Sequence, residues 1–149
     1  MSAQRRTPYA ARLAPLLAMG TCIALLSCVT HEKGEIHMIS NSYVFTIVPS
    51  ESPPRARENT LYKIVIRDRE SRQPIESGEG QMYSNDSTGA HTWDGLAKGT
   101  ELGTYYAKLN FTVAGLWAIA IRFRRDSLHH LEKIEWYQDV HNERQPAVP

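Results

Sequence analysis

Two neighbouring segments near the C-terminal end alternate apolar and polar residues, and this pattern restricts the fold more than any other feature. In the first segment, the apolar side chains are Tyr105, Ala107, Leu109, Phe111 and Val113. After a turn at Ala114-Gly115, the second segment places its apolar side chains at Trp117, Ile119, Ile121 and Phe123. A period of two puts alternate side chains on one face of an extended strand. The pattern therefore predicts two β-strands that share one core, with Trp117 inside it.

Other segments of the chain also have the composition of strands. They are rich in β-branched and aromatic residues, which favour extended structure. These segments are Tyr43–Val48, Leu61–Asp68, Ile75–Ser84 and Leu131–Tyr137. We expect a loop over His91–Gly103, and no segment after Cys28 has a sustained helical period. Six or seven short strands separated by turns predict an all-β fold, an immunoglobulin-like antiparallel β-sandwich.

The first 28 residues have the pattern of an export signal. Arg5, Arg6 and Arg12 precede Leu13–Ser27, an apolar run without charge, and Cys28 follows. The run has 15 residues and contains a proline and a glycine, whereas a membrane-spanning helix needs about 20 apolar residues. A cleaved signal therefore fits better than an anchor. The cysteine after a small residue is typical of bacterial lipoproteins, so we expect a lipoprotein signal peptide over 1–27 and lipidation of Cys28.

This leader determines the predicted domain plan. After the signal peptide over 1–27, we expect a flexible tether over 28–41, a sandwich over 42–138 and a disordered tail over 139–149. The chain has two cysteines; Cys22 would leave with the leader and Cys28 would carry lipid, so the mature chain would hold no disulfide. We expect a protein of the cell envelope, anchored by lipid and facing the periplasm or the exterior.

Charge argues against nucleic acid as a partner. Three of the 17 Lys and Arg residues lie in the leader, and none of the 16 Asp and Glu residues do, so the mature chain is slightly acidic. Nucleic-acid binding calls for a concentrated basic face. Arg122, Arg124 and Arg125 do cluster, but acidic residues follow them closely. We interpret the cluster as a solvated strand face rather than an anion site.

Two motifs in the C-terminal half indicate a family. Gly103-Thr104-Tyr105-Tyr106 precedes the first alternating strand, and Ala114-Gly115-Leu116-Trp117 precedes the second; an earlier strand ends at Asp68. Over Tyr43 to Arg124 the chain resembles the YtkA-like domain, which is related to the FixH-like proteins. The resemblance implies a small exported or membrane-anchored domain of immunoglobulin-like fold. It also implies an association with copper handling or with the assembly of respiratory enzymes.

Copper sites in exported proteins use imidazole and thioether ligands. The best candidates are His37 with Met38, and Met82 with His91. The chain lacks the tight runs of Met and His that a strong copper motif would have. In the alternative interpretation, the histidines are exposed in the tether and the loops, and Met82 belongs to the core.

No enzyme motif is present: the sequence has no glycine-rich phosphate loop, no His-Glu-x-x-His and no Cys-x-x-Cys. We therefore expect a non-enzymatic envelope lipoprotein with a binding or accessory domain that acts in metal handling or respiratory-complex assembly. The alternative is a structural or adhesive module without metal. Its partners would be the membrane, through the lipid, and an envelope protein. Trp93 either contacts a partner or a sugar, or folds back to fill the end of the core, which we favour.

Overall fold

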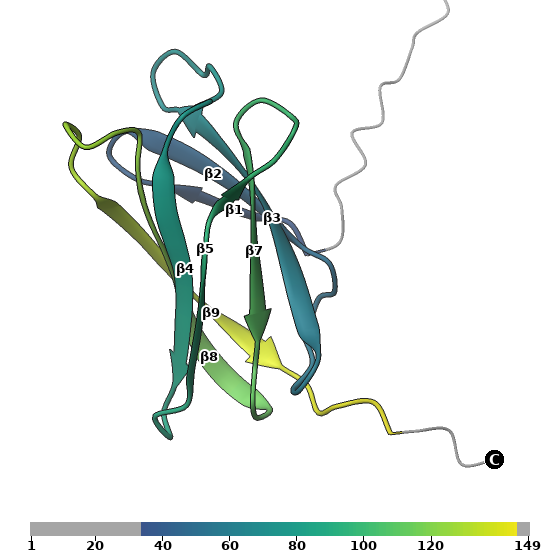
Figure 1. The fold of residues 1–149 in the computed structure, drawn as a ribbon. Coiled ribbons are helices and arrows are strands. Elements are labelled where there is room, and N and C mark those ends of the chain that lie inside the picture. The colour runs from purple at the N-terminus through teal and green to yellow at the C-terminus, as the bar shows by residue number, and fades with distance from the viewer. Residues whose placement is uncertain (1–33, 146–149) are drawn as a thin grey trace, which may run out of the picture. The chain divides into compact units, whose positions relative to one another are not determined.

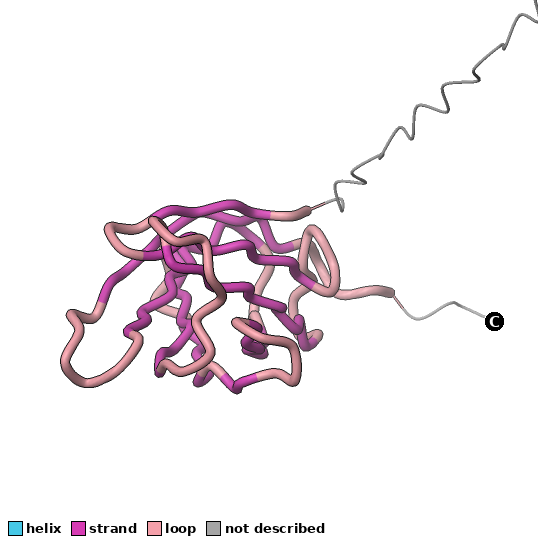
Figure 2. The backbone as a smooth tube through the Cα atoms, turned by 90° about the horizontal axis from the view of Figure 1, so that it is seen from above, coloured by secondary structure: helices cyan, strands magenta, loops and turns pink. Residues whose placement is uncertain are grey.

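The computed structural model describes residues 34–145, so the leader and Cys28 lie outside the described part. Within it the chain forms nine β-strands and no helix (Figures 1 and 2). The strands are β1 (Ile36–Ile39), β2 (Tyr43–Pro49), β3 (Asn59–Asp68), β4 (Glu79–Asp86), β5 (His91–Gly95), β6 (Ala97–Lys98), β7 (Thr104–Asn110), β8 (Gly115–Arg124) and β9 (Glu132–Val140). Accordingly, residues 34–145 contain no helix that is long and apolar enough to cross a membrane.

The strands form two antiparallel sheets that pack face to face. One sheet has the order β1-β2-β3-β7-β6, and the other has the order β5-β4-β8-β9. Without β1, this is the immunoglobulin arrangement, in which strands A, B, E and D face strands C, F and G, with a further strand beside C. The predicted all-β, immunoglobulin-like sandwich is confirmed.

The core lies between the sheets and is built from the alternating positions. The inward side chains of β7 and β8 are buried as predicted, and Trp117 is fully enclosed. Its ring meets Phe111 edge-on at 5.2 Å, and its Nε1 donates a hydrogen bond to the Val113 carbonyl oxygen at 3.1 Å. A large ring with a satisfied polar atom is well suited to fill the space between two sheets. Among residues 34–145, the core cluster extends from Ile36 to Val140, so a chain from residue 29 onward contains all of it.

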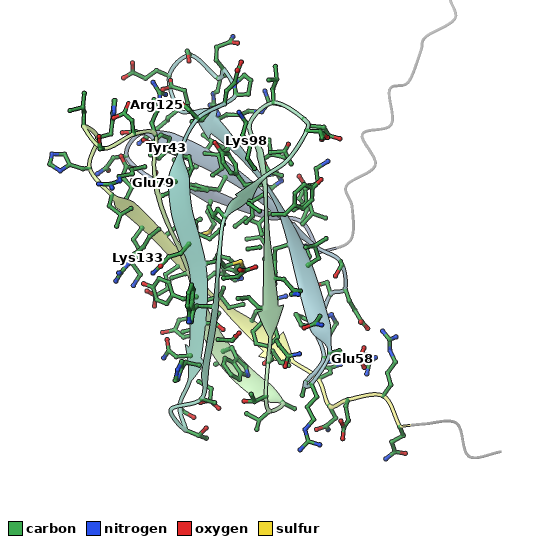
Figure 3. The ribbon with its side chains drawn as sticks, viewed as in Figure 1. Tyr43, Glu58, Glu79, Lys98, Arg125 and Lys133 are labelled. Atoms are coloured by element: carbon green, nitrogen blue, oxygen red, sulfur yellow. The ribbon has the colours of Figure 1, made fainter. Side chains whose placement is uncertain are left out.

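A cluster of aromatic rings fills the other end of the sandwich. The ring of Phe123 lies edge-on to that of Tyr43, with a centroid distance of 5.2 Å, and edge-on to that of Tyr105, with a centroid distance of 5.4 Å. The hydroxyl of Tyr105 donates to the Ile75 carbonyl oxygen at 2.9 Å, and burial raises the pKa of this phenol. The hydroxyl of Tyr43 accepts a bond from the backbone N–H of Arg125 at 3.1 Å, at the end of β8 (Figure 3). These bonds allow phenols to be used inside an apolar core.

Two predicted boundaries of the sandwich are wrong. The tether predicted over 28–41 contains β1, because Met38 lies opposite Phe45 and packs against the core. The disordered tail predicted over 139–149 begins too early, because β9 continues to Val140, which is buried. Beyond it, His141 accepts a backbone bond from Ala56 at 2.8 Å, so the chain stays attached to the β2–β3 connection.

The predicted loop over His91–Gly103 is also wrong, because it contains β5 and β6. β5 pairs with β4 in the four-stranded sheet, and β6 pairs with β7 in the other sheet. The chain therefore crosses from one sheet to the other within this segment. Short strands with few apolar residues carry a weak periodic signal, which explains the error.

Candidate ligand-binding face

The side chains of β4, β5, β8 and β9 that point away from the core form the outer face of the four-stranded sheet. The backbone register places three pairs of them side by side. Trp93 on β5 lies opposite Tyr83 on β4, and Gln81 on β4 lies opposite Arg122 on β8. Arg122 in turn lies opposite Lys133 on β9. Directly opposed side chains in an antiparallel pair are close enough to interact, so this face combines aromatic, amide and cationic groups.

The orientation of β5 determines that Trp93 belongs to this face. Its two neighbours point inward, toward β7. The Asp94 carboxylate accepts a bond from the backbone N–H of Lys108 at 2.8 Å, and the Thr92 hydroxyl accepts one from that of Asn110 at 3.4 Å. Since neighbouring side chains alternate, Trp93 points outward, and it is 67% exposed. The favoured prediction, that Trp93 fills the end of the core, is wrong.

Arg122 and Lys133 meet over the ring of Tyr83. The guanidinium carbon of Arg122 lies 5.0 Å from the ring centroid, and the Lys133 Nζ lies 6.0 Å from it. Both distances are within the range of cation–π attraction. Lys133 also pairs with Glu135, and the hydrogen bond that it donates to this carboxylate raises the pKa of the lysine. The phenol ring therefore holds two cations at one place on the sheet.

The three clustered arginines have different surroundings. Arg124 donates from Nε to Glu79 at 2.6 Å, and Arg125 donates from a terminal nitrogen to Asp68 at 2.6 Å. Among residues 34–145, no carboxylate pairs with Arg122, which interacts with the Tyr83 ring instead. Arg122 is exposed on β8, which agrees with the interpretation as a solvated strand face, but unlike the other two arginines it has no carboxylate partner among the described residues.

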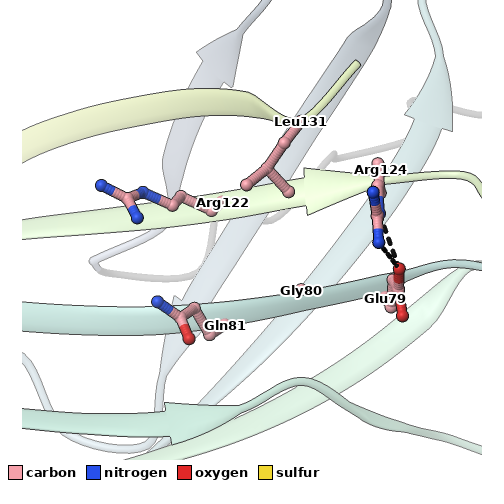
Figure 4. A pocket seen from close by; sticks show the side chains of 6 residues that line it. All are labelled: Glu79, Gly80, Gln81, Arg122, Arg124 and Leu131. Carbon is pink, nitrogen blue, oxygen red and sulfur yellow. Dashed lines mark hydrogen bonds and ion pairs between the residues drawn. The ribbon is translucent and has the colours of Figure 1, made fainter. Parts of the chain in front are cut away.

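Two adjoining hollows mark this face, and Gln81 and Arg122 line both. The first, of about 470 Å³, is drawn in Figure 4; it is lined by Glu79, Gly80, Gln81, Arg122, Arg124 and Leu131. The head groups of Arg122 and Gln81 point the same way there, away from the Arg124–Glu79 ion pair. The second, of about 370 Å³, is lined mainly by Tyr83, Asn85, His91 and Trp93 beside the same two residues. Arg122, which has no carboxylate partner in the described part of the chain, therefore lines both the hollow beside the Arg124–Glu79 ion pair and the hollow that contains the two aromatic rings.

The residues predicted to bind copper do not share one place. Met82 is fully buried and faces the core from β4, whereas His91 is exposed on the outer face of the same sheet. His37 and Met38 are neighbours on β1, so they point to opposite faces of the other sheet; His37 lies 3.3 Å from Glu35, and Met38 packs against the core. These residues do not fit a shared copper ion. In the described part, no three His, Cys, Asp or Glu side chains are grouped so that they could hold a metal.

A second polar cluster, at the end of β3, is structural in character. The Asp68 carboxylate accepts backbone bonds from Ser71 at 2.9 Å and from Glu70 at 3.1 Å, and it also binds Arg125. The bond from Ser71 is the largest of the effects that lower the pKa of Asp68 to about 2, and the arginine adds to it. The carboxylate therefore closes the turn and attaches it to the end of β8.

Comparisons with known proteins support the fold. No protein-family model and no curated protein matches the sequence. A solved DUF4426 family protein from Pseudomonas aeruginosa PAO1 is similar with a TM-score of 0.58 at 9% identity, over 76% of this chain and 100% of that one. FetP from uropathogenic E. coli strain F11 is similar with a TM-score of 0.51 at 11% identity, over 72% of this chain and 94% of that one. At such low identity, these likenesses show a shared β-sandwich fold.

Sequence reasoning missed Gln81, Tyr83 and Lys133 as members of a site. The signal was present but indirect. Once β4 is placed with Met82 inward, its neighbours must both point outward. The strand register decides which outward residues of β4, β5, β8 and β9 lie opposite one another. One sequence alone does not reveal that register.

Proposed function

We propose that this chain is a lipoprotein of the cell envelope whose sandwich domain is a non-enzymatic binding module. The outer face of the four-stranded sheet is its binding surface. One observation carries the proposal: an exposed tryptophan and an arginine without a carboxylate partner lie on either side of Tyr83, beside two open hollows. Aromatic residues and Arg are enriched in binding surfaces, where they supply most of the energy.

The envelope location is supported by the leader. A positively charged start, a short apolar run and Cys28 after a small residue are features of an exported, lipid-modified chain. Metabolic labelling with radioactive palmitate in a bacterial host tests this directly. We expect label on the wild-type chain and none on Cys28→Ser. Cys22→Ser is the matched control and should keep the label; equal labelling of Cys28→Ser would refute the anchor.

The binding surface can be tested with the mature chain from residue 29 onward, which contains the whole sandwich. We expect it to co-sediment with isolated bacterial envelope fractions, and Trp93→Ala to weaken this at least tenfold. Leu61→Ala is the matched control, because Leu61 is 45% exposed on the opposite sheet. If Trp93→Ala and Leu61→Ala bind as well as the wild type, the outer face is not the binding surface.

The resemblance to YtkA-like and FixH-like domains suggests a finer role in copper handling or respiratory-complex assembly. This role does not depend on the outer face, and the positions of Met82 and His91 give it no shared site. Titration of the mature chain with copper, followed by calorimetry, tests it. Saturable binding that His37→Ala abolishes would place a copper ion on the outer side of β1, whereas no binding would refute the copper role.

A further inference from the structure

We infer that the outer face of the four-stranded sheet binds an acidic glycan. The ring of Trp93 would stack on a sugar ring, and Arg122 with Gln81 would bind the carboxylate of a neighbouring acidic sugar. This inference rests on the proposed binding function and names the chemical class of its ligand.

The charge of the site favours an anionic group. Lys133 and Arg124 each pair with a glutamate, so the cation left to attract a ligand is Arg122. A guanidinium binds a carboxylate through two parallel hydrogen bonds, and its attraction to the Tyr83 ring holds it in place beforehand. Gln81, opposite Arg122 in the register, brings an amide donor to the same place.

The spacing of the two anchors suits a ligand longer than one sugar ring. Arg122 is opposite Gln81, and Trp93 is opposite Tyr83, two residues further along β4. Two strand spacings and two residue steps place the backbones of Arg122 and Trp93 about 12 Å apart. A ligand that reaches both must therefore carry its acidic group well away from the part that stacks. An oligosaccharide with one acidic sugar has this arrangement.

The lining of the second hollow favours a glycan over an acyl chain. Besides the two aromatic rings it presents the outward side chains of Gln81, Asn85 and His91, which both donate and accept hydrogen bonds. Sugar hydroxyls need such partners, whereas their ring C–H groups can cover the exposed face of Trp93. An acyl chain would need a deep apolar cavity, and both hollows here are open and partly polar.

The first experiment is a glycan array probed with the mature chain from residue 29 onward. The array holds oligosaccharides with uronic, sialic and muramic acids, their methyl esters and neutral oligosaccharides. We expect retention on one or more acidic glycans and at least a tenfold loss on the matching esters, which have the same sugar rings without the charge. Retention on neutral glycans alone, or on none, would overturn the inference.

Substitutions then assign the contacts by calorimetry on the best acidic glycan. We expect Arg122→Gln to weaken binding about ten- to a hundredfold and to remove the preference for acid over ester. Trp93→Ala should weaken acid and ester alike, and Trp93→Phe should restore part of the loss, because a phenyl ring can still stack. Arg67→Gln is the matched control, an exposed arginine on the opposite sheet, and should bind as the wild type does. An Arg122→Gln protein that keeps its full preference for the acid would refute the role of Arg122.

The two proposals fail in different ways. If envelope fractions bind through Trp93 while every acidic glycan fails, the binding module stands and its ligand belongs to another class; peptides with a free C-terminal carboxylate are then probed with the same variants. If neither the envelope fractions nor the glycans bind, the binding function itself is wrong.

Discussion

The two faces of the four-stranded sheet are made by the same strands, yet they differ in nearly every property. On β8, Ile121 and Phe123 point inward and are fully buried, whereas Arg122 between them points outward. The inner face is apolar, with interlocking rings. The outer face has polar, aromatic and charged side chains. Among the charged ones, Arg122 has no carboxylate partner within residues 34–145. The comparison shows that alternate positions along one strand have different roles: the inward residues stabilise the domain, and the outward residues are available for binding.

The largest expected effect is on the inner face. Trp117→Ala should lower the free energy of unfolding by about 3–5 kcal/mol, because it removes the largest ring of the core and leaves a cavity. Urea denaturation followed by circular dichroism measures the change. A loss below about 1 kcal/mol would contradict the division between the faces, since it would make this core position as tolerant as the surface.

A smaller effect isolates one polar atom inside the core. Tyr105→Phe keeps the ring but removes the hydroxyl that donates to the Ile75 carbonyl oxygen. We expect a loss of about 1 kcal/mol in unfolding free energy, typical of one buried hydrogen bond. The same denaturation experiment applies. A loss as large as that of a truncated core ring would mean that the hydroxyl bond organises the aromatic cluster.

Acid should weaken the contact between the β3 end and the β8 end. Because the folded pKa of Asp68 is about 2, below its ordinary value of 3.8, the ionised carboxylate stabilises the fold above about pH 4. This contribution is lost as the pH falls from 4 toward 2. We expect the stability of Asp68→Asn to decline less steeply over this window than that of the wild type, as measured by thermal unfolding at stepped pH. Parallel curves would show that this carboxylate does not contribute to the acid sensitivity.

The smallest effects on stability are expected on the outer face. Trp93→Ala and Arg122→Gln should change the free energy of unfolding by no more than about 0.5 kcal/mol, because both side chains are exposed. The same substitutions are expected to have the largest effects on binding. If either substitution lowers the free energy of unfolding as much as Trp117→Ala does, the outer face contributes to folding. A loss of binding in that variant would then reflect unfolding.

The sequence predicted the fold well where its pattern was strongest. The alternating residues of β7 and β8 indicated both strands, their inward faces and the buried Trp117, because one buried face imposes a period of two. The sequence pattern predicted a loop where β5 lies, because His91–Gly95 has only one large apolar residue and this strand forms by pairing with β4. The candidate face could be predicted only in part. Trp93 and Arg122 were visible as residues, but their positions around Tyr83 follow from the register of four strands.

The short N-terminal strand has a consequence for how far the module can move from the membrane. β1 is fixed in its sheet from Ile36 onward, only eight residues after Cys28. If Cys28 carries a lipid as proposed, a leash of that length can extend no more than about 30 Å. The domain would then remain within a short distance of the lipid surface, so it would bind ligands that are fixed near that surface more often than ligands far from it.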